Sequence, residues 1–313
     1  MSDWKILITD GLEADGQSLL RAAAQVDDRD GISAEALAQA LGEYDALIVR
    51  GRTRVTRMLL ELAPRLKVVG RSGVGVDNID LAAAAERGVK VVNAPHSTSI
   101  AVAELAFGML LALARRLPYA DRTMKQGEWA KKSLQGIELS GKSLGVIGMG
   151  NIGSAVASRA AAFGMQPMGY DPLLDDDEIA RRGAQPVSLH EIFECADFIT
   201  LHVPLTEATR NLVDTAALAD MKRGVYIVCT ARGGIIDEAA LLAALNAGHV
   251  AGAALDVFAQ EPPGLTELVG HERVITTPHI GAQTAEAQAR AAVDIAHEVL
   301  RALRGEKLRW RVA

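Results

Sequence analysis

The segment from residue 144 to residue 171, LGVIGMGNIGSAVASRAAAFGMQPMGYD, constrains the fold more strongly than any other part of the chain. An apolar run leads into glycines at positions 148, 150 and 153, an alanine-rich run follows, and a second apolar run ends at Asp171. This order predicts a strand, a tight turn, a helix and a second strand. A glycine-rich turn needs no ligand by itself, so the flanking elements are what favour a dinucleotide-binding unit.

Each glycine of this turn has a physical reason. Gly148 permits the tight turn after the strand, and Gly150 lets the backbone approach a pyrophosphate without a Cβ in the way. Gly153 allows the helix to pack closely against the strand. The free N–H groups at the start of the helix would then hold the phosphates.

The residue that ends the second strand predicts which dinucleotide binds. Asp171 is placed to accept hydrogen bonds from the adenosine ribose hydroxyls, and its charge would repel a 2′-phosphate. The following Pro172 and Leu173 provide no arginine to neutralise that phosphate. We therefore predict NAD as the cofactor, while Arg181 and Arg182, further along the chain, leave tolerance of NADP open.

The 313 residues are enough for two domains, each with its own core. Short apolar runs alternate with helical patterns, which is typical of parallel strands joined by crossover helices. In the first hundred residues the expected strands are 5–9, 45–49, 66–70 and 89–93. From residue 142 onward they are 142–148, 165–171, 196–204, 224–231, 251–257 and 273–278.

Two long helices indicate how the domains are connected. One is expected at about 99–116, after possible capping residues in NAPHSTS, and an amphipathic one at about 284–304, long enough to return to the first domain. We predict a Rossmann-type doubly wound parallel sheet in a dinucleotide-binding domain, residues 98–283. It is inserted in a second, flavodoxin-like α/β substrate-binding domain, residues 1–97 and 284–313.

Composition narrows the class of partner. Lys and Arg total 33 against 39 Asp and Glu, a net charge of −6, which favours a small-molecule substrate over nucleic acid or an anionic membrane surface. The two cysteines form no CxxC pair, so we expect neither a disulfide framework nor a metal site. The longest apolar stretch, residues 101–114, is shorter than the roughly 20 residues that a helix needs to span a membrane. The polar N-terminus is unlike a signal peptide, and we expect a cytoplasmic protein.

Three polar residues lie where later strands are expected to end, the edge at which an open parallel sheet binds ligands. Arg232 offers a guanidinium fork for a substrate carboxylate, Glu261 precedes two prolines, and His279 follows Pro278. Each alone is an ordinary surface residue. Together they supply the base, the carboxylate anchor and the orienting partner that oxidation of a 2-hydroxy acid by NAD requires. His202, at the end of another strand, could also contact the cofactor, and His96 could line the cleft.

The motifs that carry these residues resemble a known family. ARGGIIDEAALLAAL, GAALDVFAQEPP and TPHIGAQT follow the glycine turn in the order typical of the D-isomer-specific 2-hydroxyacid dehydrogenases. With VVGRSGVGVDNIDLAAAAERGVKVVNAP, the chain is most similar to members that oxidise D-3-phosphoglycerate to 3-phosphohydroxypyruvate, the entry step to serine. The resemblance covers nearly the whole chain. It implies an active site in the cleft between two α/β domains, and a homodimer, or a tetramer, built on the cofactor domains and the long helix before them.

The resemblance also implies a role for each matching residue. His279 is the acid/base, Glu261 its partner and Arg232 the anchor of the substrate carboxylate. The residues implied to contact NAD are Val74, Gly148, Gly150, Asn151, Ile152, Gly153, Asp171, His202, Val203, Pro204, Thr230, Ala231, Arg232, Asp256, His279, Gly281 and Ala282. Those implied to contact the substrate are Arg50, Arg52, Arg71, Ser72, Gly73, Arg232 and His279.

Two departures from the family pattern leave alternatives open. Many phosphoglycerate-oxidising members carry a C-terminal serine-sensing domain, whereas this sequence ends at GEKLRWRVA, so we expect no feedback inhibition through such a domain. Gly51 stands where similar sequences often have serine, next to the expected site of a substrate phosphate. The alternatives are a dehydrogenase for another 2-hydroxy acid, such as glycerate, lactate or sulfolactate, and an NAD(H)-sensing protein that resembles corepressors.

Overall fold

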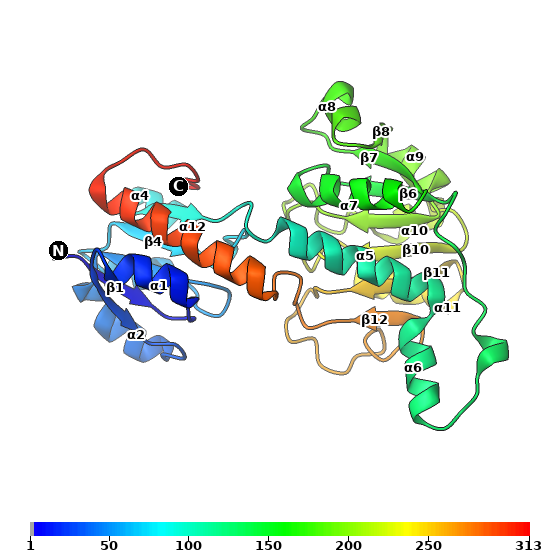
Figure 1. The fold of residues 1–313 in the computed structure, drawn as a ribbon, viewed down its shortest axis with the longest axis horizontal. Coiled ribbons are helices and arrows are strands. Elements are labelled where there is room, and N and C mark those ends of the chain that lie inside the picture. Colours follow the sequence, from blue (N-terminus) through cyan, green and yellow to red (C-terminus); the bar gives the residue numbers. More distant parts are fainter. Residues whose placement is uncertain (1–2) are drawn as a thin grey trace. The chain divides into compact units, whose positions relative to one another are not determined.

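The computed structural model describes residues 3–313, which divide into two compact units (Figure 1). The first unit contains the residues up to Ser99 together with Ala282–Ala313, and the second contains Ile100–Gly281. The second unit is thus inserted between the two segments of the first. Each unit has a parallel sheet of its own, so the predicted fold class is confirmed.

The sheet of the first unit has five strands in the order β2-β1-β3-β4-β5, the flavodoxin-like order 2-1-3-4-5. The strands are β1 (Lys5–Ile8), β2 (Gln25–Asp28), β3 (Ala46–Val49), β4 (Val68–Arg71) and β5 (Lys90–Asn93). The helices are α1 (Ala14–Arg21), α2 (Ala34–Ala40), α3 (Arg57–Glu61), α4 (Leu81–Glu86) and α12 (Ala285–Arg304), with a short 3-10 helix η1 (Leu41–Glu43). β2 and α2 were not predicted from the sequence. β2 reads QVDD and is largely exposed, so it presents no apolar run.

The C-terminal helix packs on a helix from the start of the chain. In Figure 1, α1 and α12 lie side by side although they are far apart in the sequence. They approach so closely that a Cβ at Gly16 would lie 2.5 Å from the carbonyl oxygen of Ala292. The apolar side of α12, which includes the fully buried Ile295 and Val299, covers the strands of this unit. This packing attaches α12 to the first unit.

The sheet of the second unit has seven parallel strands in the order β12-β11-β10-β9-β6-β7-β8. They are β6 (Ser143–Ile147), β7 (Gln166–Tyr170), β8 (Gln185–Pro186), β9 (Phe198–Leu201), β10 (Val225–Cys229), β11 (Val250–Leu255) and β12 (Val274–Thr276). Six were predicted, and the two-residue β8 is too short to give a pattern. Strand order reverses between β6 and β9, and ligands of such sheets bind outside the carboxyl ends of the strands at this point.

Helices cover both faces of this sheet. One core includes residues of α9 (Leu189–Cys195), α10 (Thr215–Asp220) and α11 (Glu238–Asn246). The other includes residues of α5 (Ser99–Arg115) and α7 (Asn151–Ala162). The remaining helices of the unit are α6 (Leu117–Lys125), α8 (Asp176–Arg181) and a short 3-10 helix η2 (Lys131–Ser133). Within residues 3–313, no helix combines the length and apolar character that crossing a membrane requires.

Candidate active site

The glycine turn lies between β6 and α7, at the strand-order reversal of the second sheet. Gly148 has φ +93°, and a Cβ there would lie 2.8 Å from the carbonyl carbon of His202. A Cβ at Gly153 would lie 2.0 Å from the carbonyl oxygen of Gly148. At Gly150, by contrast, a Cβ would meet no described atom within 4 Å. Two positions therefore admit only glycine for packing, while the third leaves open space at the N-terminus of a helix, as a bound pyrophosphate needs.

Asp171 is part of this turn as well as of the expected ribose site. Its Oδ2 accepts a hydrogen bond from the N–H of Met149 at 3.0 Å, and its Oδ1 accepts one from the N–H of Leu173 at 3.0 Å. The two bonds fix the plane of the carboxylate and leave lone pairs for hydroxyl donors. Glycines, helix terminus and carboxylate therefore fit a dinucleotide.

The end of β9 places a half-buried histidine, whose ring Nδ1 is fully buried, beside the turn. The N–H of His202 donates to the carbonyl of Ile147 at 2.8 Å, and its Nε2 lies 2.9 Å from the Thr200 hydroxyl. Burial lowers the pKa of His202 to about 3, so the ring is neutral at physiological pH. The next residues, Val203 and Pro204, continue the loop, and the Val203 side chain borders Gly148. His202 therefore lies beside the glycine turn, and its neutral ring does not serve as a proton donor.

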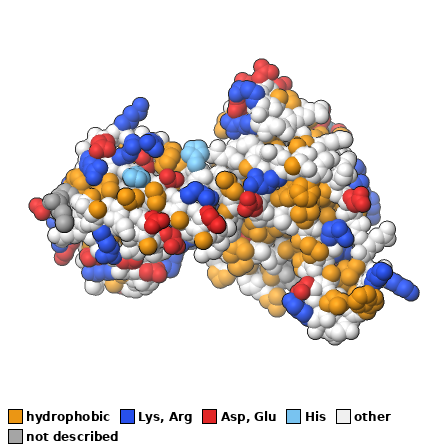
Figure 2. Space-filling view, viewed as in Figure 1, with side chains coloured by type: hydrophobic (Ala, Val, Ile, Leu, Met, Phe, Trp, Pro, Cys, Tyr) orange, Lys and Arg blue, Asp and Glu red, His pale blue; other side chains and the backbone are white. Residues whose placement is uncertain are grey.

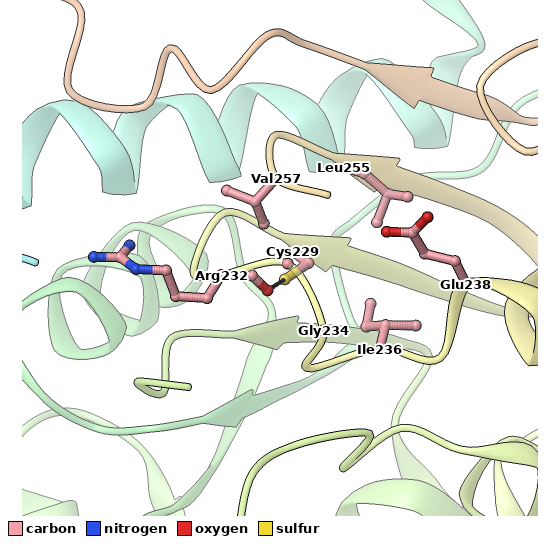
Figure 3. Close-up of a pocket in the computed structure, with 8 residues that line it drawn as sticks. Cys229, Arg232, Gly234, Ile236, Glu238, Leu255 and Val257 are labelled. Atoms are coloured by element: carbon pink, nitrogen blue, oxygen red, sulfur yellow. Dashed lines mark hydrogen bonds between the residues drawn. The ribbon is translucent and has the colours of Figure 1, made fainter. Parts of the chain in front are cut away.

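The loop after β10 carries Thr230, Ala231 and Arg232. The Thr230 hydroxyl is buried and has no hydrogen-bond partner in the described structure, which makes it available to a bound group. Arg232 donates from Nη1 to the carbonyl of Ala231 at 2.6 Å, and its side chain points away from Glu238 (Figure 3). In the small pocket behind the loop, burial raises the pKa of the Cys229 thiol to about 11, so it stays protonated and is no nucleophile.

The predicted acid/base pair is formed within the second unit. His279 Nδ1 lies 2.8 Å from Glu261 Oε2, although the residues come from loops after different strands, β12 and β11. The other carboxylate oxygen of Glu261 accepts the N–H of Phe258 at 3.1 Å, which fixes its direction. The His279 side chain is 48% exposed, so its second ring nitrogen can be reached by a substrate.

Asp256 holds the loop that contains this histidine. Its side chain is fully buried. Oδ1 accepts the Thr277 hydroxyl at 2.6 Å and the N–H of Ile280 at 2.8 Å, while Oδ2 accepts the N–H of Gly281 at 2.8 Å. Between these anchors His279 has φ +52°, a left-handed conformation that is uncommon outside glycine. This placement indicates that Asp256, predicted from the sequence to lie near the cofactor, positions the histidine loop.

In the first unit, the candidate residues Arg50 and Arg52 lie on a loop held by Asp10. The Asp10 carboxylate accepts the N–H groups of Arg50 and Thr53 at 2.8 and 3.1 Å and the Thr53 hydroxyl at 2.5 Å. Burial acts to raise the pKa of Asp10, but these bonds and the charge of Arg52 outweigh it and lower the pKa. Arg52 itself bonds the carbonyl of Thr9 and pairs with Asp10, whereas among residues 3–313 the Arg50 guanidinium reaches only a side-chain oxygen of Gln283 at 3.2 Å. Arg50 is thus better placed to receive a ligand.

The loop after β4 carries Arg71, Ser72, Gly73 and Val74. Arg71 folds back over Gly73, where a Cβ would lie 1.6 Å from its Nη1, and Gly73 has φ +138°. The positive φ favours glycine at this position, whereas the guanidinium end of Arg71 could move away from a Cβ. The carbonyl of Val74 accepts the amide of Asn93 from the end of β5 at 2.7 Å. The remaining candidate, Ala282, offers its carbonyl to the Gln288 side chain and begins the return to the first unit.

Several residues that build these loops were not found from the sequence. Asp10 and Glu238 bond backbone N–H groups of loops distant in sequence, at Arg50, Thr53 and Ala259. Arg182 was noted only for NADP tolerance, yet its guanidinium donates to the carbonyl of Met149 in the glycine turn at 2.6 Å. A side chain that bonds backbone carries no sequence motif for its distant partner, so only the fold reveals these contacts.

Residues 107–281 match the family described as D-isomer specific 2-hydroxyacid dehydrogenase, NAD binding domain. The chain belongs to this family. Its second unit is therefore an NAD-binding domain, and NAD is the cofactor, as predicted.

Relatives cover both units. A D-3-phosphoglycerate dehydrogenase of Methanocaldococcus jannaschii is 48% identical over 303 residues, 96% of this chain and 58% of that protein. The solved structure of a glyoxylate reductase from Paecilomyes thermophila matches with a TM-score of 0.91 and 29% identity, over 100% of this chain and 99% of that one. A D-lactate dehydrogenase from Aquifex aeolicus, complexed with NAD and lactic acid, matches with a TM-score of 0.83 and 30% identity over 96% of each chain. The chain spans little more than half the length of the first curated relative it matches, 58%.

Proposed function

We propose that this protein is an NAD-dependent dehydrogenase that oxidises D-3-phosphoglycerate to 3-phosphohydroxypyruvate. The observation that carries the proposal is the 2.8 Å contact between His279 Nδ1 and Glu261 Oε2 in an NAD-binding domain. The choice of substrate is supported by the relative from Methanocaldococcus jannaschii, which is named a D-3-phosphoglycerate dehydrogenase and is 48% identical.

The pair determines which ring nitrogen reacts. A carboxylate accepts but does not donate, so Nδ1 of His279 carries the proton toward Glu261 and Nε2 has a free lone pair. Nε2 accepts the proton of the substrate's C2 hydroxyl as the hydride leaves C2, and Glu261 stabilises the resulting imidazolium. Bound NAD supplies the acceptor for that hydride. In the reverse direction the imidazolium returns the proton to the carbonyl oxygen.

Cationic side chains would orient the 2-hydroxy acid substrate. Arg232 binds the substrate carboxylate through its guanidinium fork and so directs C2 toward His279. Arg50, whose guanidinium contacts only an amide oxygen, and Arg71 are the cations proposed for the substrate phosphate. Arg52 serves to hold the loop that carries Arg50, since its guanidinium is bonded to Thr9 and Asp10.

A substrate panel tests the assignment. Initial rates with NAD are measured for D-3-phosphoglycerate, D-glycerate, D-lactate and sulfolactate, and with NADH for the corresponding 2-keto acids. We expect kcat/KM for D-3-phosphoglycerate to exceed that for D-glycerate by at least about 100-fold, since an arginine contact with a desolvated phosphate contributes several kcal/mol. Activity confined to unphosphorylated acids would overturn the substrate assignment and leave the family chemistry intact.

Acids without a phosphate are the second candidate. The observation that favours them is Gly51, which leaves the loop between Arg50 and Arg52 without a side chain next to the proposed phosphate site. The same panel discriminates between the candidates, because a lactate or glycerate enzyme gains nothing from the phosphate.

We propose further that the protein forms a homodimer through α5 and α6. Large apolar side chains on and beside these helices are exposed: Leu117 to 53%, Met124 to 56% and Trp129 to 78%. Figure 2 shows hydrophobic side chains gathered on the face of the second unit where α5 lies. Sedimentation velocity tests the proposal: wild type is expected near twice the 33.1 kDa chain mass, and Trp129→Glu with Met124→Glu near the chain mass. A wild-type monomer would contradict it.

A further inference from the structure

The backbone of Met149 is held by charged side chains at its N–H and at its carbonyl. Met149 lies between the first two glycines of the turn. Its N–H donates to Asp171 Oδ2 at 3.0 Å, and its carbonyl accepts Nη1 of Arg182 at 2.6 Å. Its side chain is fully buried against β7, where a Cβ at Gly169 would lie 3.0 Å from Met149 Cγ. Three independent contacts thus fix one residue of the phosphate-binding turn.

Arg182 reaches the turn from the end of α8. Its Nε donates to Glu178 Oε1, one helical turn earlier, at 2.5 Å, and its side chain is 32% exposed. Arg181 is adjacent in sequence and pairs with the same glutamate, but its side chain is 70% exposed. Of these two arginines, Arg182 is the one that bonds the glycine turn. Arg181 is therefore a matched control of equal charge.

Fixing this peptide has two consequences for a dinucleotide. The N–H groups that begin α7 follow Met149 after one residue, so their direction toward the phosphates depends on the orientation of the Met149–Gly150 peptide, whose carbonyl Arg182 bonds. In addition, Met149 links two charged groups: its N–H bonds the Asp171 carboxylate, which is proposed to accept the ribose hydroxyls, and its carbonyl bonds the Arg182 guanidinium. Guanidinium groups bind phosphate in bidentate fashion, so the residue that Asp171 contacts is also contacted by a cation suited to a 2′-phosphate.

We propose that Arg182 is a positioning and specificity-determining residue of the cofactor site. It acts on NAD through the carbonyl of Met149, and it supplies the cation for a ribose 2′-phosphate when the Asp171 carboxylate is removed. The inference rests on the NAD site used in the proposed function and is independent of which acid is oxidised.

The first test is fluorescence titration of the full chain with NADH. We expect Arg182→Leu to bind NADH about tenfold more weakly than wild type, because a charged hydrogen bond to the turn is lost. Arg182→Lys, which keeps a cationic donor, should recover most of the affinity, and Arg181→Leu should stay within about twofold of wild type. If Arg182→Leu does not fold, as judged by far-UV circular dichroism, Arg182→Gln replaces it. Arg182→Leu, or Arg182→Gln in its place, binding NADH as tightly as Arg181→Leu would overturn the positioning role.

The second test uses NADPH. Asp171→Ala should bind NADPH at least about tenfold more tightly than wild type, because the repulsion of the 2′-phosphate is removed while the guanidinium stays. Adding Arg182→Gln should abolish this gain, whereas adding Arg181→Gln should leave it. A gain that survives in Asp171→Ala/Arg182→Gln overturns the specificity role. Both tests measure binding alone, so a failure here is distinct from a failure of the substrate assignment.

Discussion

The ends of β12 and β9 place two histidines at the same edge of one sheet, with opposite chemistry. His279 is 48% exposed and faces the Glu261 carboxylate at 2.8 Å. His202 faces only the Thr200 hydroxyl at 2.9 Å, and burial lowers its pKa to about 3. A strand-end position beside the cofactor is thus insufficient to make a histidine a proton carrier. Access from outside and an anionic partner are what distinguish His279.

Of the substitutions that compare the two histidines, replacing His279 should change the turnover rate most. We expect His279→Gln to lower kcat by about 10²- to 10⁴-fold, since glutamine cannot accept the hydroxyl proton. The Kd for NADH, measured by fluorescence titration, should stay within about threefold of wild type, because the change affects the chemical step. Near-normal turnover would remove His279 from the mechanism.

Removing the negative charge beside His279 should have a smaller effect. Glu261→Gln keeps a hydrogen-bond acceptor for Nδ1 but loses the carboxylate that stabilises the imidazolium, and kcat should fall by about 10- to 100-fold. Glu238→Gln is the matched control: Glu238 bonds the N–H of Ala259 in the same loop at 2.6 Å and does not contact His279. Steady-state rates for both variants measure the difference. Equal losses of kcat would mean that the structure of the loop, rather than the negative charge of Glu261, supports turnover.

His202 should influence stability toward acid by a modest amount. The pKa of His202 is about 3 in the folded protein and near 6.5 when unfolded, so between these values the unfolded state binds the extra proton. The stabilisation is complete above about pH 6.5 and is lost as the pH falls toward 3. His202→Gln cannot take up this proton, so wild type should lose a few degrees more of Tm than the variant between pH 7 and pH 4.5. Parallel Tm curves would show that His202 is not held neutral.

The difference between the two histidines was only partly predictable. The glycine spacing, the strand-end loops and the catalytic residue types are local patterns, so the fold class and the candidates could be predicted from sequence. The left-handed conformation of His279 could not, because it depends on the buried Asp256 carboxylate, which bonds Thr277, Ile280 and Gly281. Nor could the burial of His202 under the turn, which arises when β9 pairs with β6.

Two strands were missed for related physical reasons. β2 is a polar edge strand with largely exposed side chains, and β8 has only two residues, so neither presents an apolar run.

The hydrogen bond from Arg182 to the Met149 carbonyl joins residues 33 positions apart through backbone, so no side-chain pattern in the sequence indicates it. Contacts of this kind depend on tertiary packing.

A double-mutant cycle on the His279 and Glu261 pair tests the central claim most directly. The kcat of wild type, His279→Gln, Glu261→Gln and the double variant is measured with saturating NAD and D-3-phosphoglycerate. If Glu261 acts only through the imidazole, the double variant should be no slower than His279→Gln alone, because nothing remains for the carboxylate to stabilise. Losses that multiply in the double variant would show that the two residues act independently, and would contradict the account of an acid/base pair.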